Sequence, residues 1–314
     1  MAYPFYESLR QSYPQAEITF LCGENLKSFP DSGLCQKKIV LDKAAKRVGP
    51  EFFRLVHQLR KENFNMAIAL TASISSSLLL GTAKIPVRVG FSQSGSGLFL
   101  TDSLKWKGID AGKHKTNLYL ELLEFMTGRP CPRKIEGEAH RSIQKKIVVA
   151  PGASISLRVW PYYFELIRSL ALSYPDYEIA VVGARQESHW HELIQKINLK
   201  NLSDFVEKTP LSELIDLCRE SQLIIANDSG TAHLAGSIAK VPTLVLFGPG
   251  SPDYIKPIGP EVYCEIPRNI SCHPCEKAEC HEKYGYQICL KSISLEAVLE
   301  RIKEVLALRH SLPS

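Results

Sequence analysis

The sequence predicts an α/β fold of two doubly wound domains, and three observations lead to this prediction. Short apolar runs rich in β-branched residues alternate with segments whose apolar residues recur at helical spacing. The apolar runs are continuous, as expected for parallel strands that helices cover on both faces. The alternation stops once, at the polar segment 128–146 with two prolines and two glycines, and then starts again.

The first half of the chain opens with a helical pattern at 4–13, in which Phe5, Leu9 and Tyr13 share one face. A parallel α/β domain normally opens with a strand, so the chain begins in the middle of a strand–helix unit. The elements predicted after this helix are strands at 16–22, 38–41, 66–70 and 87–91 and helices at 51–61 and 117–125.

The second half repeats the alternation after the polar segment, which we interpret as a linker. Its predicted elements are strands at 146–150, 178–183, 222–226 and 243–247 and helices at 163–173, 212–219 and 295–308. We therefore expect one domain at 1–140 and another at 141–314. The helix at 295–308 carries its apolar residues on one face, and because such a terminal helix commonly crosses back to the first domain in this fold class, we expect it to do so here.

Composition narrows the function classes. The chain has 314 residues, of which 45% are apolar and 23% charged, as in ordinary globular proteins. Its net charge of +5 suits an anionic substrate or a membrane surface, and no basic run with interleaved aromatics indicates nucleic-acid binding. No apolar run approaches the ~20 residues of a membrane span. With no signal-peptide pattern and nine cysteines, an odd number, we expect a cytoplasmic protein.

The most informative segment is 222–249, where an apolar strand pattern ends at Asp228 and a helix of small residues begins near Thr231. Gly230 lets backbone N–H groups approach a ligand, and a helix start offers unpaired donors to a diphosphate. His233 is placed to reach the same pocket, and Asp228 either caps the helix or orients a neighbour. The alternative is a capped strand–helix turn with a core histidine. The combination D-x-G-T-x-H followed by small residues favours the ligand site.

Two further turns follow strands of the second half. After the strand at 146–150, Ser154 offers a hydroxyl and Arg158 a fixed positive fork for phosphate oxygens. A solvent-facing arginine in an ordinary loop is the equal alternative. After the strand at 178–183, Glu187 is a candidate acceptor for ribose or base hydrogen bonds, or a charge at a helix start with no ligand.

These segments together resemble glycosyltransferase family 9, the ADP-heptose:lipopolysaccharide heptosyltransferases. The resemblance rests on Pro-Gly-Ala-Ser…Arg-x-Trp-Pro, the G-x-x-x-E turn and N-D-S-G-T-A-H-L-A, which occur in the family's order and spacing. In the first half, SYPQAEITFLC, IPVRVGF and HKTNLYLELLEFMTG extend it over nearly the whole chain. The segment Asp228–His233 is the specific part.

The resemblance implies two Rossmann-like domains that face each other, the GT-B arrangement, with 1–140 binding the acceptor and 141–314 the nucleotide-sugar. It implies an inverting transferase with no bound metal or cofactor, acting on ADP-heptose and a lipopolysaccharide or lipid-linked glycan, in peripheral contact with the inner membrane. Glu187 would face the ribose or base. The donor-binding residues would be Ser154, Arg158, Glu187, Asp228, Gly230, Thr231 and His233.

Two departures from the family pattern concern catalysis and the acceptor. The family's base is an Asp in a Gly-Asp turn after the first strand, and both that strand and the Asp are absent here, so no catalytic residue is assigned. Either the chain starts late at an internal Met, or it is a nucleotide-sugar-binding homologue without catalysis. We expect the late start, because losing a central strand would uncover Phe5 and Leu9. Where the family often has an arginine, this chain has a run of serines near Ser76.

Lys113, His114 and Lys115 are the candidate residues for acceptor charge, with a solvated basic turn as the alternative. The late cysteines Cys272, Cys275, Cys280 and Cys289 have the spacing C-x2-C-x4-C-x8-C. Thiolates at such spacing bind Zn²⁺ in some proteins, but the family pattern favours a reduced cluster and no metal. A zinc-stabilised interaction module is therefore the least favoured class. A dinucleotide oxidoreductase is disfavoured because no G-x-G-x-x-G follows a strand.

Overall fold

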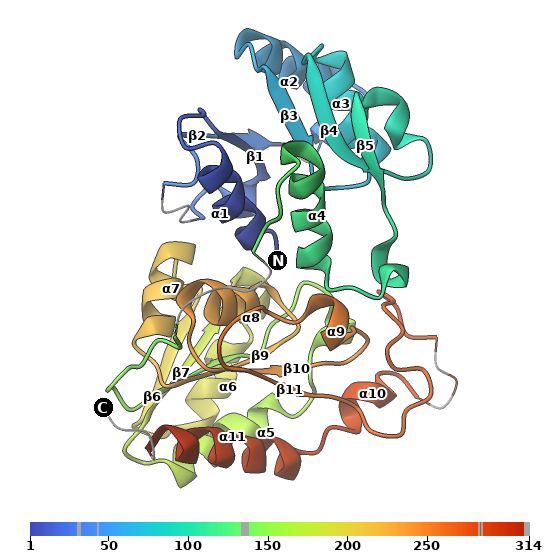
Figure 1. Cartoon of the computed structure of the whole chain (residues 1–314). Coiled ribbons are helices and arrows are strands. Elements are labelled where there is room, and N and C mark those ends of the chain that lie inside the picture. The colour runs from blue at the N-terminus through green and yellow to red at the C-terminus, as the bar shows by residue number, and fades with distance from the viewer. Residues whose placement is uncertain (30–32, 43, 133–137, 282, 284, 311–314) are drawn as a thin grey trace. The chain divides into compact units, whose positions relative to one another are not determined.

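The computed structural model describes the chain except at positions 30–32, 43, 133–137, 282, 284 and 311–314 (Figure 1). It divides into an N-terminal unit, Ala2–Arg133, and a C-terminal unit, Lys134–Ser314, which also includes Met1. The division falls inside the segment 128–146 that the sequence suggests as a linker. No helix in the described part of the chain is long and apolar enough to cross a bilayer.

The described strands of the N-terminal unit form two parallel sheets. β1 (Thr19–Gly23) pairs with β2 (Lys37–Leu41), and β4 (Val87–Ser92) lies between β3 (Met66–Ala69) and β5 (Asp102–Lys105). The sheet residues of β1 are only half-buried or exposed, unlike those of a central strand. The helices of this unit are α1 (Tyr3–Ser12), α2 (Pro50–Lys61), α3 (Ile74–Thr82) and α4 (Lys115–Thr127).

The apolar face of helix α1 is buried within the N-terminal unit. Phe5 and Leu9 of α1 are buried, with 1% and 8% of their surfaces exposed, because α1 packs against α4. The expectation that these two side chains would be left uncovered without a further strand is therefore wrong. The apolar face of α1 is covered by a helix that comes more than a hundred residues later in the chain.

The C-terminal unit contains one parallel sheet of six strands in the order β11-β10-β9-β6-β7-β8 (Figure 1). This is the order of a dinucleotide-binding doubly wound sheet, in which the strand order reverses between the first and fourth strands. Here those two strands are β6 and β9. The strands are β6 (Lys146–Ala150), β7 (Glu178–Gly183), β8 (Leu202–Val206), β9 (Leu223–Asn227), β10 (Thr243–Leu246) and β11 (Val262–Glu265).

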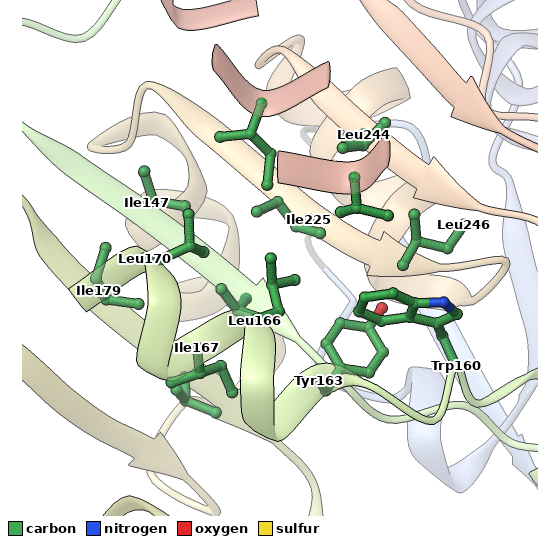
Figure 2. Packing of buried hydrophobic residues seen from close by; sticks show 14 of the residues in the cluster. Ile147, Trp160, Tyr163, Leu166, Ile167, Leu170, Ile179, Ile225, Leu244 and Leu246 are labelled. Atoms are coloured by element: carbon green, nitrogen blue, oxygen red, sulfur yellow. The ribbon is translucent and has the colours of Figure 1, made fainter. Parts of the chain in front are cut away.

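Alternate residues of these strands point to opposite faces of the sheet, and both faces are buried. One face packs with Leu166, Ile167 and Leu170 of α5 (Tyr163–Ser173) and with Trp160, as Figure 2 shows. The remaining helices of this unit are α6 (Trp190–Ile197), α7 (Leu211–Arg219), α8 (Gly230–His233), α9 (Pro252–Ile255), α10 (Ile288–Lys291) and α11 (Leu295–His310).

The terminal helix α11 belongs to this core. Val298 and Ile302 are fully buried in it, and α11 lies beside α5 (Figure 1). The apolar face that suggested a crossing to the first domain is thus used within the C-terminal unit.

Candidate functional site

The candidate site lies where the C-terminal sheet reverses its strand order. β6 and β9 are direct neighbours, with Ala150 opposite Ala226, so the turns that follow them start side by side at the carboxyl edge of the sheet. Doubly wound sheets bind ligands at this switch point. The two segments that the sequence singles out, 147–161 and 222–249, therefore meet at one place.

Asn227, the last residue of β9, ties these turns together. Its Oδ1 accepts a hydrogen bond from Trp160 N at 3.0 Å, and its amide nitrogen donates to Pro151 O at 2.8 Å and Gly152 O at 3.2 Å. The side chain is fully buried. Sequence reasoning missed this role; an amide directly before D-x-G at a strand end is the signal that could have found it, because a buried amide requires partners for both its donor and acceptor groups.

Arg158 and Asp228 face each other across the two turns. Arg158 Nη1 lies 2.9 Å from Asp228 Oδ2, and Asp228 is 5% exposed. Burial raises the pKa of the Asp228 carboxyl to about 6, with Glu276 raising it and Arg158 lowering it by their charges. Asp228 thus pairs with Arg158, and Ser229 rather than Asp228 takes the N-cap position of α8.

Three buried polar atoms around this pair have no hydrogen-bond partner in the described part of the chain. They are Arg158 Nε, Asp228 Oδ2 and Ser229 Oγ. Buried polar groups are nearly always hydrogen-bonded, so three such atoms at one switch point indicate a place where a polar ligand binds. The Arg158–Asp228 contact is accordingly electrostatic rather than an aligned hydrogen bond.

The start of α8 is open. Gly230 is exposed, and a Cβ added to it would meet no atom within 4 Å. Thr231 and His233, the other predicted contacts in this helix, are half-buried. The helix continues as a π-helical segment, Leu234–Ala239, whose side chains are mostly buried. The space beside the Gly230 Cα is therefore not filled by any side chain.

Glu187 reaches the same edge of the sheet from β7. Its Oε2 accepts a hydrogen bond from Ala184 N at 2.8 Å, and the residue is 8% exposed. A Cβ on Gly152 would lie 2.6 Å from the Glu187 carboxyl carbon. Burial raises the pKa of the Glu187 carboxyl, and the Ala184 amide opposes this shift. The carboxylate thus lies against the loop after β6, where Ser154 is exposed.

The turn after β10 closes the other side of Asp228. A Cβ on Gly250 would lie 2.8 Å from Asp228 Oδ2. The cysteine-rich segment holds this turn, because Cys275 N and Glu276 N donate to Pro249 O and Glu276 Oε1 accepts from Ser251 N. None of the four late cysteines forms a disulfide, and the described residues contain no group of three or more His, Cys, Asp or Glu side chains arranged to hold a metal.

The residues predicted for the acceptor take local roles in the N-terminal unit. Lys113 Nζ pairs with Glu121 Oε1 at 2.6 Å, and His114 caps α4 by accepting a hydrogen bond from Thr116 N at its Nδ1. Lys115 is the first residue of α4. In the serine run, Ser73 caps α3 through Ser76 N. An acceptor role for the basic turn stays a prediction.

The fold places the chain in the class of doubly wound α/β proteins, with the charged pair Arg158–Asp228 at the switch point. The family model described as "Glycosyltransferase family 9 (heptosyltransferase)" matches residues 52–285, so the chain belongs to that family and is a glycosyltransferase.

Individual relatives match this chain over nearly its full length. The chain is 25% identical to "Lipooligosaccharide heptosyltransferase 2" of Haemophilus influenzae, over 98% of this chain and 95% of that protein. It is 25% identical to "Lipopolysaccharide heptosyltransferase 2" of Escherichia coli, over 98% and 94%. Among solved structures, the ADP-heptose lps heptosyltransferase II of E. coli superposes with a TM-score of 0.75 at 20% identity, over 99% of this chain and 95% of that one. A family 9 glycosyl transferase from Veillonella parvula gives 0.77 at 19% identity, over 98% and 92%.

Proposed function

We propose that this protein transfers a heptosyl group from ADP-heptose to a lipopolysaccharide core acceptor, with inversion at the anomeric carbon and without a bound metal. The relatives from Haemophilus influenzae and Escherichia coli are heptosyltransferases of lipooligosaccharide or lipopolysaccharide, and they support the sugar and the acceptor. The pair of Arg158 and Asp228 and the unfilled space beside Gly230 support a diphosphate-linked donor. The single observation that carries the proposal is the pairing of Arg158 with the buried Asp228 at the switch point of β6 and β9.

The proposed chemistry needs positive charge at the leaving group. When the bond from the sugar to the diphosphate breaks, the diphosphate gains negative charge, and fixed donors aimed at it lower the barrier. Arg158 is positioned for this by Asp228 and keeps an unpartnered Nε. The amides at the start of α8 add their aligned dipoles. We propose that these groups supply the charge that a metal ion supplies in other transferases.

Glu187 is the proposed partner of the nucleoside. Its carboxylate accepts one hydrogen bond from Ala184 N and keeps further acceptor capacity for ribose hydroxyls. Its position against Gly152 places it at the same edge of the sheet as Arg158. Ser154 and Thr231 offer hydroxyls to the same ligand. The proton of the acceptor hydroxyl needs a base, and this role is not assigned to a residue of this chain.

We further propose that the protein acts in the cytoplasm, in peripheral contact with the inner membrane, because a glycolipid acceptor is held in a bilayer. The net charge of +5 favours approach to an anionic surface. Vesicle sedimentation with anionic and neutral lipids checks this part.

Calorimetric titration of the full chain with ADP, GDP and UDP tests donor recognition. We expect ADP to bind tightest, and Arg158→Ala to weaken it by about tenfold or more, as for a lost charge-assisted phosphate contact. Arg168→Ala removes an exposed arginine from α5 and serves as the matched control. Turnover of ADP-heptose with a lipopolysaccharide core acceptor then tests transfer. Absence of nucleotide diphosphate binding would contradict the proposal.

A second candidate is a nucleotide-sugar-binding homologue that does not catalyse transfer. The separation of β1-β2 from β3-β4-β5 among the described strands favours it, because the N-terminal unit then lacks a continuous sheet edge on which to place a base. ADP binding without turnover by the full chain is the result that distinguishes this candidate from the transferase.

A further inference from the structure

The N-terminal unit carries a hollow of about 390 Å³ at the carboxyl ends of β4 and β5. Ser92 ends β4 and Lys105 ends β5, and these two residues are opposite each other in the sheet. The lining begins directly after these strands, with Gln93 and Trp106, and continues through Lys107 to Asp110. The hollow therefore occupies the edge of a parallel sheet at which such folds bind ligands.

Trp106 forms an anchored aromatic wall of this hollow. Its ring lies edge-on to Phe91 at 4.8 Å and stacks on Tyr119 at 6.3 Å with an interplanar angle of 25°. Its backbone N donates to Ser92 O at 2.9 Å. The side chain is nevertheless only half-buried, and Ile109 beside it is 41% exposed. A rigid aromatic face that stays accessible binds the apolar face of a flat ligand at low entropic cost.

Charged groups flank the aromatic wall. Lys105 and Lys107 line the hollow, are exposed, and make no ion pair among the described residues. Gln93 and Asp110, also in the lining, offer amide and carboxylate groups to hydroxyls. Two ammonium groups attract a phosphate or carboxylate, while the aromatic wall and the polar groups match a sugar ring with its hydroxyls.

We propose that this hollow binds an anionic saccharide, a sugar that carries a phosphate or a carboxylate, as a part of the acceptor. Trp106 stacks on the ring, and Lys105 and Lys107 pair with the anionic group. This inference rests on the proposed function for its link to the acceptor, but the binding itself does not depend on donor recognition. It places the acceptor charge at residues 105–107 rather than at the basic turn 113–115.

Trp106 fluorescence gives a direct test on the full chain. The other two tryptophans, Trp160 and Trp190, are 1% and 7% exposed, so the accessible signal comes from Trp106. The probes are glucose 6-phosphate, glucuronate, glucose and inorganic phosphate. We expect saturable changes with the two anionic sugars and binding about tenfold weaker for glucose and for phosphate alone. Trp106→Phe should abolish the change in fluorescence that the anionic sugars cause.

Variants test whether the sugar binds in this hollow and not at the proposed donor site around Arg158. Lys105→Ala/Lys107→Ala lowers the affinity for glucose 6-phosphate by about tenfold or more and leaves the affinity for ADP unchanged within about twofold. Lys61→Ala, an exposed lysine at the end of α2, changes neither. Arg158→Ala leaves the Trp106 titration unchanged. Equal affinity for phosphate and glucose 6-phosphate, or no effect of the double lysine variant, overturns the inference. Loss of ADP binding alone contradicts only the proposed function.

Discussion

Gly152 and Glu187 approach so closely that a Cβ on Gly152 would lie 2.6 Å from the Glu187 carboxyl carbon. The loop after β6 and the turn after β7 thus meet where any side chain larger than that of glycine would have to displace the Glu187 carboxylate. Because Glu187 is also bonded to Ala184 N, its carboxylate has little freedom to move away. The geometry of the proposed nucleoside contact depends on this pair.

Gly152→Ala is therefore expected to destabilise the protein by about 1–3 kcal/mol, the usual cost of forced overpacking. The substitution should also displace Glu187 and weaken ADP binding. Chemical denaturation and ADP titration measure the two effects. If alanine at this position changes neither the stability nor the affinity for ADP, the loop after β6 accommodates the methyl group without cost.

Gly230→Ala provides the contrast, because a Cβ at Gly230 would meet no atom within 4 Å. We expect stability to change by no more than about 1 kcal/mol, the helix-propensity difference between glycine and alanine. The affinity for ADP should nevertheless fall by about tenfold, since the methyl group occupies the space that the diphosphate needs. An unchanged affinity for ADP would show that the diphosphate does not bind at the start of α8.

Asn227→Ala removes three hydrogen bonds that join β9 to the loop after β6. Each buried group left without a partner costs about 1–3 kcal/mol, so a loss of roughly 3 kcal/mol or more is expected. Asn227→Asp keeps the shape but turns a carboxylate oxygen toward the carbonyls of Pro151 and Gly152, and it should cost at least as much. Urea denaturation with matched m-values checks both variants, and a loss within experimental error for either would contradict the role.

Asp228 makes stability depend on pH in a defined direction. Burial raises its pKa from 3.8 to about 6 in the folded state, so the folded state binds the proton more tightly than the unfolded state. Its contribution is fully present below about pH 4 and is lost as the pH rises through about 6, a change of roughly 3 kcal/mol.

Asp228→Asn mimics the protonated carboxyl, so the difference in unfolding free energy between wild type and variant isolates this group. The wild type is expected to lose unfolding free energy relative to the variant as the pH rises from 4 to 7. Above that range the difference should stay constant. A difference that is flat over the whole interval would show that Asp228 titrates normally.

Arg158 is expected to affect stability through Asp228. Arg158→Ala leaves a buried carboxylate without its counter-charge, and breaking a pair of this kind from one side is costly. The double variant Arg158→Ala/Asp228→Asn removes the stranded charge and should recover part of the lost stability. If the double variant is as unstable as the sum of the single variants, the two side chains are not coupled.

The sequence predicted β1 to β4, β6, β7, β9 and β10, because each of these segments carries a run of apolar residues, whether the strand is fully buried like β9 or half-exposed like β1. It missed β5, β8 and β11, which lie at the edges of their sheets and carry mixed residues such as Asp102–Lys105. These three edge strands are partly exposed, and their mixed residues lack the apolar run by which the other strands were recognised.

The site was only partly visible for a related reason. Glycine, serine, arginine and aspartate after apolar strands indicate turns with ligand-binding chemistry, and the structure brings these turns together because β6 and β9 are neighbours. The pairing of Arg158 with Asp228, the threefold role of Asn227 and the contact of Glu187 with Gly152 join residues that are 35 to 76 positions apart. No local pattern encodes such distances.

The sequence by itself determined the alternation of strands and helices, the turn chemistry at 228–233 and the membership of a glycosyltransferase family, because these properties depend on residues close together in the chain. Only the tertiary structure decided the strand order, the burial that raises the pKa of Asp228, and the hollow beside Trp106. The physical reason is that burial and electrostatic pairing depend on which distant segments become neighbours, and that choice is made by packing of the whole domain.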